Sequence, residues 1–294
     1  MSYLLLAAFL WGTSFIAGKF AYELADPILV VQLRLVIAAV LMLPIFIRSC
    51  WQIPKALWGR VAFLAFLTFP ATFLLQFIGL KYTSAASAAT MLGIEPLLLV
   101  MLGHWFFNEP AKRHDWALSL LAFVGVVLVV GLGNRAAVSV WGCLLVLASA
   151  VVAAIWIHLS RRLLKTVSPQ AYTAATIVLG AVLCLPFTLL LTQDWQLRPS
   201  ASGIAALLYL GIGCSLVAGW AWNKGLLSAP TSVGGIFLAL DPVFGVGLAM
   251  LLLGERLGAT GLLGVLLVLS AAGLSVWIQV RASSTAAGKK TAKR

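Results

Sequence analysis

The chain consists almost entirely of apolar stretches long enough to cross a lipid bilayer. Ten can be identified: 3–20, 27–47, 58–79, 84–106, 115–132, 141–160, 169–191, 202–222, 230–253 and 259–280. A helix needs roughly 17–25 apolar residues to cross the hydrocarbon core. Only 10% of the residues are charged, against about 25% in a soluble domain. We therefore expect an all-α integral membrane protein with ten transmembrane helices.

The first half of the sequence recurs in the second half. Pro27 and Pro44 return 142 positions later as Pro169 and Pro186. Three further features return 146 positions later: Gly79-Leu80 as Gly225-Leu226, Glu95-Pro96 as Asp241-Pro242, and Glu109 as Glu255. We interpret 1–134 and 139–280 as two repeats of five spans each. An odd number of spans turns the second repeat upside down, which predicts two inverted five-helix repeats.

Positive charge is concentrated on one side of the predicted membrane topology. With the N-terminus in the cytoplasm, fourteen of the 20 basic residues are cytoplasmic: Arg48, Lys55, Arg60, Lys112, Arg113, Arg161, Arg162, Lys165, Lys224, Arg281, Lys289, Lys290, Lys293 and Arg294. Because cytoplasmic loops retain positive charge, we expect an inner (plasma) membrane protein with both termini in the cytoplasm. Residues 281–294 form a basic cytoplasmic tail that is polar enough to be disordered.

Several motifs, in the order in which they occur, resemble those of EamA-type transporters in the drug/metabolite transporter superfamily. They are Trp11-Gly12-Thr13-Ser14-Phe15, Arg34, Tyr82-Thr83-Ser84-Ala85-Ala86, Glu95-Pro96 and Gly254-Glu255-Arg256. The resemblance covers both repeats. It implies ten helices around a central cavity and the export of small metabolites or drugs, with amino acids prominent among the substrates. The chain departs from the family pattern at Asn108-Glu109, where Gly-Glu is commoner. The second copy of the first span also lacks the Trp-Gly pair.

Glu95 and Asp241 lie near the middle of their spans. An ionised carboxylate at that depth is costly unless it is paired, hydrated or protonated, so neither side chain is expected to face lipid. Pro96 and Pro242 follow them and predict helix kinks. Symmetry relates the two kinks across the axis where inverted-repeat transporters hold substrate. Alternatively, each carboxylate satisfies donors exposed at a helix break (Ser87, Thr90, Thr231, Ser232).

The predicted substrate-binding residues are Trp11, Ser14, Gln76, Glu95, Trp156, Trp222 and Asp241. The repeat relates Ser14 to Trp156 and Gln76 to Trp222, and an amide with two indoles could stack on and hydrogen-bond an amphipathic solute. Lipid-facing packing explains the two tryptophans equally well. For Arg34, in the second span, we favour a structural ion pair over contact with a substrate carboxylate or snorkelling to the interface.

These features predict a secondary transporter that exports amino acids or amphipathic drug-like solutes by alternating access. A carrier of nucleobases, vitamins or sugar derivatives is the alternative among transporters. A membrane-embedded lipid-modifying enzyme and a non-transporting subunit of an assembly are the alternatives of another class. No Walker motif, metal-ligand spacing or cofactor motif occurs, so we expect no catalytic residues, no cofactor, no metal and no nucleic-acid partner.

Two carboxyl groups in one apolar site also suggest proton coupling. We expect one of Glu95 and Asp241 to be protonated at rest, and to exchange its proton for, or pair with, an amino-bearing substrate. The expected partners are therefore a small-molecule substrate, the lipid bilayer and protons. Substrate identity, coupling ion, direction and oligomeric state stay open.

Overall fold

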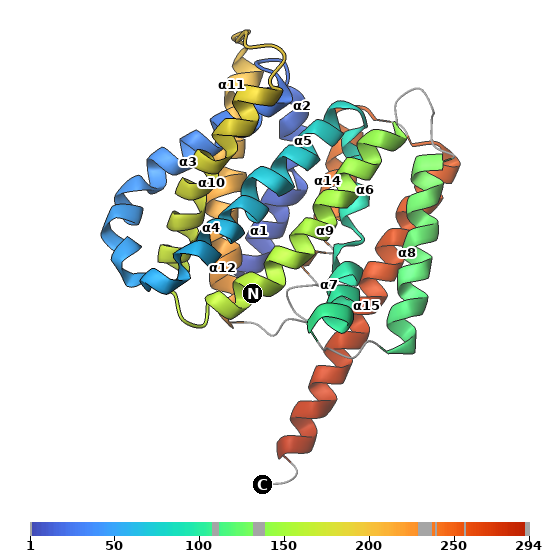
Figure 1. Ribbon diagram of the computed structural model, residues 1–294. Coiled ribbons are helices and arrows are strands. Elements are labelled where there is room, and N and C mark those ends of the chain that lie inside the picture. Colours follow the sequence, from blue (N-terminus) through green and yellow to red (C-terminus); the bar gives the residue numbers. More distant parts are fainter. Residues whose placement is uncertain are drawn as a thin grey trace.

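The computed structural model describes residues 2–107, 112–131, 139–228, 237–238, 240–255 and 257–291. Within these ranges every regular element is a helix (Figure 1). Seven helical stretches are long and apolar enough to cross a membrane: Ser2–Ala21, Pro27–Gln52, Lys55–Lys81, Ala85–Phe106, Val140–Leu163, Pro169–Leu191 and Ala201–Leu227. Two shorter apolar helices are Asp241–Leu252 and Ala259–Ala271. The chain is therefore a multi-pass integral membrane protein.

The helices of the first half follow one another with short connections. They are α1 (Ser2–Gly12), α2 (Ser14–Ala21), α3 (Pro27–Ser49), α4 (Trp58–Phe66), α5 (Thr72–Lys81), α6 (Ala85–Leu92), α7 (Glu95–Phe107) and α8 (Arg113–Gly131). The short 3₁₀ helices η1 (Cys50–Gln52) and η2 (Lys55–Leu57) follow α3, and the π-helix η3 (Leu67–Ala71) joins α4 to α5.

The helices of the second half are joined in a similar order. They are α9 (Val140–Leu163), α10 (Pro169–Leu191), α11 (Ala201–Leu208), the π-helix η4 (Tyr209–Val217), α12 (Ala218–Ser228), α14 (Asp241–Leu252) and α15 (Ala259–Thr291). Glu109, Asn134, Thr231, Ser232 and Arg256, which figured in the sequence predictions, lie outside the described residues.

Helices α3 and α10 show how the repeated prolines set helix starts. Each helix has 23 residues and begins with a proline at its first position, where the missing N–H has no intrahelical partner to lose. The preceding residue caps each start: Asp26 Oδ1 accepts a hydrogen bond from Ile28 N at 2.9 Å, and Ser168 Oγ accepts one from Ala171 N at 3.3 Å. The repeated prolines therefore mark equivalent helix starts in the two halves.

The two π-helices also occupy equivalent places. Leu67, the first residue of η3, and Tyr209, the first residue of η4, are separated by the same 142 positions as the repeated prolines (209 − 67 = 142). At each π-helix a hydroxyl side chain donates a hydrogen bond to the carbonyl oxygen five residues earlier. The bonds run from Thr72 Oγ1 to Leu67 O at 2.7 Å and from Ser215 Oγ to Leu210 O at 2.9 Å. π-Helices are rare and often occur at functional sites, so both draw attention to the space that they border.

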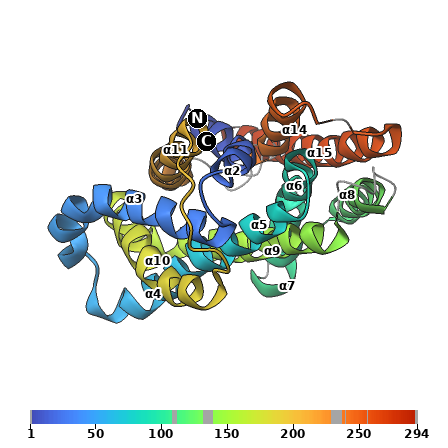
Figure 2. The same ribbon diagram turned by 90° about the horizontal axis from the view of Figure 1, so that it is seen from above.

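The halves pack against each other along most of their length. Helix α3 packs on α10, α5 on α9, α1 on α12, α6 on α14, and α8 on α15 (Figure 2). Glycines allow the closest approaches, because a Cβ added at Gly79 would lie 2.7 Å from Gly142 O and one at Gly125 would lie 2.7 Å from Gly264 O. Small residues at helix contacts are typical of membrane bundles.

Three predicted segments differ in detail from the helices observed. The span predicted at 3–20 is interrupted at Thr13, and the span at 84–106 is interrupted between Leu92 and Glu95. The span predicted to end at 222 continues to Ser228. The tail from residue 281 was predicted to be disordered. This prediction is wrong for residues 281–291, because α15 continues to Thr291. The alanines, serines and lysines of this segment are tolerated in a helix.

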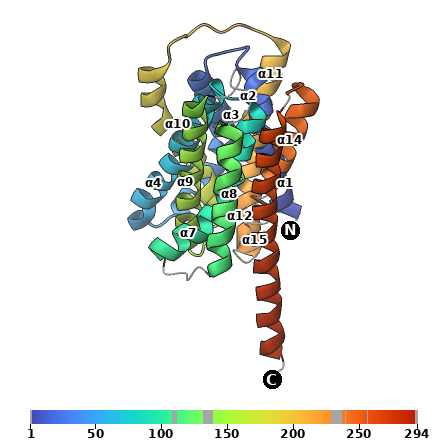
Figure 3. The same cartoon turned by 90° about the vertical axis from the view of Figure 1, so that its right-hand side faces the viewer.

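The described chain starts and finishes at the same end of the molecule. Helix α1 begins there, and α15 projects from that end beyond the rest of the bundle (Figures 1 and 3). Such an arrangement requires an even number of crossings.

Candidate functional site

A central cavity collects the predicted site residues from both halves of the chain. Its lining includes all seven predicted binding residues, Trp11, Ser14, Gln76, Glu95, Trp156, Trp222 and Asp241, and also Arg34. The described parts of α8 and α15 contribute none of the lining. In this conformation the centres of water molecules can reach about 70 Å³ of the cavity, enough for several waters. A drug-sized solute therefore requires the walls to move.

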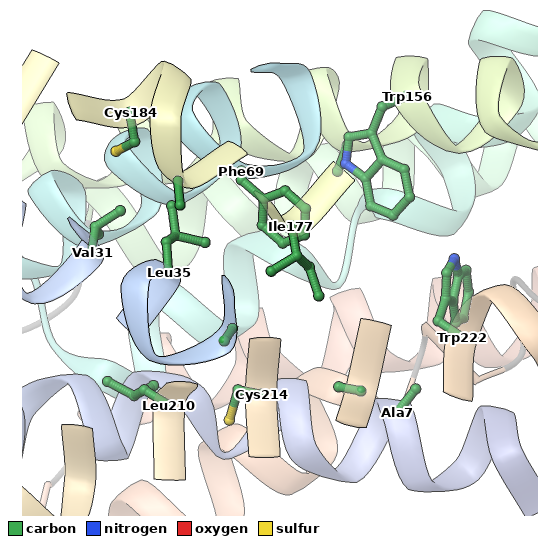
Figure 4. Packing of buried hydrophobic residues seen from close by; sticks show 14 of the residues in the cluster. Ala7, Val31, Leu35, Phe69, Trp156, Ile177, Cys184, Leu210, Cys214 and Trp222 are labelled. Carbon is green, nitrogen blue, oxygen red and sulfur yellow. The ribbon is translucent and has the colours of Figure 1, made fainter. Parts of the chain in front are cut away.

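Aromatic side chains form much of the cavity wall. Trp156, on α9, and Trp222, on α12, come from opposite sides and point toward the space between them (Figure 4). The ring centroids of Trp11 and Trp222 are 5.2 Å apart at an interplanar angle of 52°. Trp11 is fixed further by a hydrogen bond from Nε1 to Cys214 O at 3.0 Å. The wall can thus stack on a planar or apolar part of a solute.

The two buried carboxyl groups stand at helix starts. Glu95 is the first residue of α7 and Asp241 the first residue of α14, and they are 5% and 4% exposed. Negative charge is favoured in the first turn of a helix, which offsets part of the cost of burial. Pro96 and Pro242 occupy first-turn positions where no backbone donor is needed. The sequence therefore interrupts its helices where the carboxyl groups enter the cavity.

Arg34 is held between a hydroxyl and two phenyl rings. The side chain is 1% exposed, and its Nε donates to Ser215 Oγ at 2.9 Å. Its guanidinium carbon lies 4.2 Å from the ring centroid of Phe73 and 5.0 Å from that of Phe77. Among the described residues no carboxylate lies within salt-bridge distance of Arg34, so the predicted ion pair stays a prediction. Cation–π contacts provide the observed stabilisation.

Five buried polar atoms of residues on the cavity wall have no hydrogen-bond partner within the described part of the chain, and one of them is the hydroxyl oxygen of Thr68. The other four divide evenly. Two are donors, Trp156 Nε1 and Trp222 Nε1, and two are acceptors, Asn223 Oδ1 and Asp241 Oδ1. Leaving a buried polar group unsatisfied costs about 1–3 kcal/mol. Proteins seldom keep several such groups together, so this set is suited to a polar solute or to water.

Sequence reasoning missed several polar residues of the cavity. Asn223 donates from Nδ2 to Thr173 Oγ1 at 2.8 Å, and both line the cavity with Thr68, Thr72, Tyr172 and Thr176. Asn223 was overlooked because the predicted span ended one residue before it. The threonines were overlooked because a threonine in an apolar helix can satisfy its hydroxyl on its own backbone, as Thr176 does on Tyr172 O at 2.9 Å. An asparagine beside Trp222 was the one available signal.

Glu255, from the recurrent Gly-Glu motif, lies away from the cavity and joins the two halves. Its Oε1 and Oε2 accept from Ala85 N at 2.8 Å and Ala86 N at 2.9 Å, capping the start of α6. Nearby, Lys19 Nζ donates to Leu80 O at 2.8 Å and Thr83 O at 2.6 Å. A carboxylate at a helix start satisfies otherwise orphan backbone donors. The motif therefore has a structural role here.

Comparisons with known proteins agree with this architecture. An uncharacterized transporter of Bacillus subtilis, YwfM, is 27% identical over 92% of this chain and 93% of its own length. An S-adenosylmethionine/S-adenosylhomocysteine transporter of Chlamydia muridarum is 25% identical over 85% of this chain and 83% of its own length. One crystal structure matches with a TM-score of 0.69 at 20% identity, covering 95% of this chain and 96% of that one, and so shares the fold. The model of the EamA-like transporter family matches residues 1–131 and again 140–277. The chain belongs to the EamA-like transporter family.

Proposed function

We propose that the protein is a ten-span secondary transporter, built from two inverted repeats, that exports small amino-bearing metabolites or amphipathic drug-like solutes by alternating access. The observation that carries the proposal is the central cavity, to which both halves contribute. Two donors, two acceptors and the hydroxyl of Thr68 have no hydrogen-bond partner there among the described residues. A solute that hydrogen-bonds to these atoms removes the free-energy cost of leaving them buried and unsatisfied.

Equivalent contacts in the two halves support the inverted repeat. Exchanging the halves turns the α5–α9 contact into the α12–α1 contact, and both are observed. The same holds for single residues. A Cβ on Gly79 would lie 2.8 Å from Val146 Cγ2, and one on Gly225 would lie 2.6 Å from Leu4 Cδ2. Gly225 and Val146 are the repeat mates of Gly79 and Leu4. The two separate matches of the family model agree with this division of the chain.

The chemistry of the cavity favours a solute with both an ammonium group and an acceptor group. Asp241 Oδ1 and Asn223 Oδ1 suit an ammonium group, and the two indole N–H groups suit a carboxylate or carbonyl oxygen. Arg34 adds a positive charge to the same cavity. Amino acids and amphipathic amines carry these groups. The two carboxyl groups provide sites where a proton can exchange for a cationic solute, so we propose protons as the coupling ion and the inner membrane as the location.

A second candidate is a nucleoside-bearing solute. The relative in Chlamydia muridarum is named for such compounds. Trp156 and Trp222 offer two aromatic faces to one cavity, which suits a planar base. Both candidates use the same cavity, and they differ in whether the stacked group is required.

Transport in proteoliposomes tests the proposal. The purified protein is screened with amino acids, aromatic amines and nucleosides, and Trp156→Phe is compared with Trp141→Phe, an exposed tryptophan on the same helix. We expect a solute whose KM rises about tenfold in Trp156→Phe, the loss of roughly one good hydrogen bond, and is unchanged in Trp141→Phe. If the folded protein moves nothing in the panel, or if both variants behave alike, the cavity is not the transport site.

A further inference from the structure

A second hollow lies on the outer surface of the bundle, where α1 and α2, α11 and η4, and α14 meet. The groove has a volume of about 520 Å³ and is walled mainly by apolar side chains: Phe9, Ile16, Phe20, Ala205, Leu248 and Leu252. Its deepest polar groups, Thr13 Oγ1 and Tyr209 OH, hydrogen-bond to each other at 2.6 Å. With that pair satisfied, the inner part of the groove presents an apolar surface to whatever covers it.

The groove is as long as one leaflet of a bilayer is deep. Along α1 and α2 it extends from Phe9 to Phe20, a separation of eleven residue steps (20 − 9 = 11). At 1.5 Å per residue this is about 16 Å, close to half of the roughly 30 Å hydrocarbon core. Phe20 lies near the outer end of its span and Phe9 near the middle. The groove thus runs from the membrane surface to the midplane, the path of a single acyl chain.

Charged and hydroxyl groups gather at the surface end of the groove. Ser202, one of the lining residues, donates from Oγ to Glu23 Oε2 at 2.5 Å. The backbone of Arg198 lies next to Leu24, which follows Glu23, because the Arg198 N–H donates to Leu24 O at 2.8 Å. The Arg198 side chain is 71% exposed and binds Asp194 Oδ2 through Nη2 at 3.0 Å. A carboxylate, hydrogen-bonded to the lining residue Ser202, therefore lies at one end of an apolar groove, and an exposed guanidinium paired with Asp194 follows in the neighbouring connection.

We propose that this groove binds a phospholipid with an ammonium headgroup. One acyl chain lies along the groove, the ammonium group meets Glu23 and Ser202, and the phosphate meets the exposed guanidinium of Arg198. A free fatty acid fits less well because its carboxylate meets the carboxylate of Glu23. A partner helix fits less well because it is about 10 Å wide and continues past the midplane. The proposal does not depend on what the central cavity carries.

The bound chain lies against two irregular parts of the wall. Thr13 lies at the break between α1 and α2, between the cavity residues Trp11 and Ser14. Tyr209 is the first residue of the π-helix that contains the cavity residue Cys214. Trp11 Nε1 bonds Cys214 O at 3.0 Å, and Cys214 Sγ bonds Leu10 O at 3.0 Å. The groove and the cavity thus lie on opposite sides of the same helix segments, so a lipid bound in the groove stabilises the walls of the cavity.

Lipid binding to the purified chain tests the proposal. The delipidated protein in detergent is titrated with phosphatidylethanolamine, phosphatidylcholine or phosphatidylglycerol, and the bound lipid is counted by native mass spectrometry. Phosphatidylethanolamine is expected to bind best, since its ammonium group donates hydrogen bonds that a trimethylammonium group lacks. Ala205→Trp fills the groove from an exposed position and should weaken this binding about tenfold, the loss of roughly two buried methylene groups. Ala117→Trp, at an exposed position on α8, is the matched control and should bind as the unaltered protein does.

Glu23→Gln keeps the shape of the headgroup site and removes its charge, so the preference for phosphatidylethanolamine over phosphatidylglycerol should disappear while the acyl chain still binds. Size-exclusion profiles and thermal midpoints establish that each variant is folded, and Ala205→Phe replaces Ala205→Trp if the latter is not. Equal binding of the three lipids to the unaltered protein overturns the proposal. Equal effects of Ala205→Trp and Ala117→Trp also overturn it. So does a dimer that Ala205→Trp dissolves, which would assign the groove to a second copy of the chain.

Discussion

At the scale of single residues, the cavity is defined by side chains that the fold leaves partly unsatisfied. Trp156 and Trp222 have indole N–H groups with no partner among the described residues, and Asn223 and Asp241 have free acceptor atoms. From the sequence, lipid-facing packing explained the two tryptophans equally well. It does not fit the structure, because Trp156 is only 7% exposed and Trp222 only 1% exposed. A hydrophobic span that retains buried polar atoms without partners indicates selection for something other than stability.

Replacing the carboxyl groups of the cavity should remove the pH dependence of transport. Glu95→Gln and Asp241→Asn keep shape and hydrogen-bonding capacity but cannot titrate. If one carboxyl exchanges a proton for the solute, at least one variant should transport at a rate that is constant between about pH 5 and pH 8, while the unaltered protein varies. The rates are measured in proteoliposomes, with Asp194→Asn as the control at an exposed carboxylate. Unchanged rates and pH profiles in both variants would mean that the carboxyl groups serve only the helix starts.

The residues of the site were predictable where sequence symmetry or an intramembrane charge marked them. Glu95, Asp241 and Arg34 stood out because charge is costly in a span, and Gln76 and Ser14 because they are repeat mates of tryptophans. Asn223 was missed because hydropathy does not fix where a span ends. Arg34 was expected to pair with a carboxylate, and its contacts with Phe73 and Phe77 depend on packing between helices, which no local pattern reveals.

At the scale of helices, apolar length predicted most positions, and Pro96 and Pro242 predicted irregular helix geometry where α7 and α14 begin. The break at Thr13 and the π-helices were not predicted. The break at Thr13 follows Gly12 and has no proline beside it, and a single glycine within an apolar span does not by itself end a helix. The π-helix at Tyr209–Val217 likewise has no proline, whereas its mate at Leu67–Ala71 contains Pro70. These interruptions arise because neighbouring helices re-satisfy the backbone, a tertiary effect.

Close helix contacts predict that two glycine substitutions change the stability of the protein differently. A Cβ at Gly79 would lie 2.7 Å from Gly142 O and 2.8 Å from Val146 Cγ2, whereas nothing lies within 4 Å of one at the exposed Gly247. Gly79→Ala should therefore destabilise the protein by about 1–3 kcal/mol, as overpacking does. Gly247→Ala should be neutral or stabilising by up to about 1 kcal/mol, because alanine favours helix. Thermal unfolding in detergent measures both. A similar midpoint for the two variants would contradict the contact between α5 and α9.

At the scale of the whole molecule, the account depends on two halves that cross the membrane in opposite directions. The start of α1 and the end of α15 lie on the same side of the bundle (Figure 3). The distribution of lysine and arginine predicts that this side is the cytoplasm. The contacts of α3 with α10 and of α8 with α15 are those that the proposed inverted repeat expects between an element and its repeat mate.

Reporter fusions test this orientation in cells. A reporter that is active only in the periplasm should be silent after Arg294 and active when inserted at Asn134. The proposed topology places five spans between the N-terminus and Asn134, and ten between the N-terminus and Arg294. The opposite pattern would reverse the orientation, and activity at both sites would exclude five spans between Asn134 and Arg294.

Alternating exposure of one cavity is the central claim, and cysteine labelling tests it most directly. In a chain whose four native cysteines (Cys50, Cys143, Cys184, Cys214) are replaced by serine, single cysteines are placed at position 76 or 222. Oriented vesicles are then treated with a membrane-impermeant maleimide, with and without a saturating transported solute. We predict that Gln76→Cys reacts only from the side opposite the termini and Trp222→Cys only from the side of the termini. The solute should raise one rate and lower the other. Reaction of both positions from one side, at rates that no solute changes, would contradict the account.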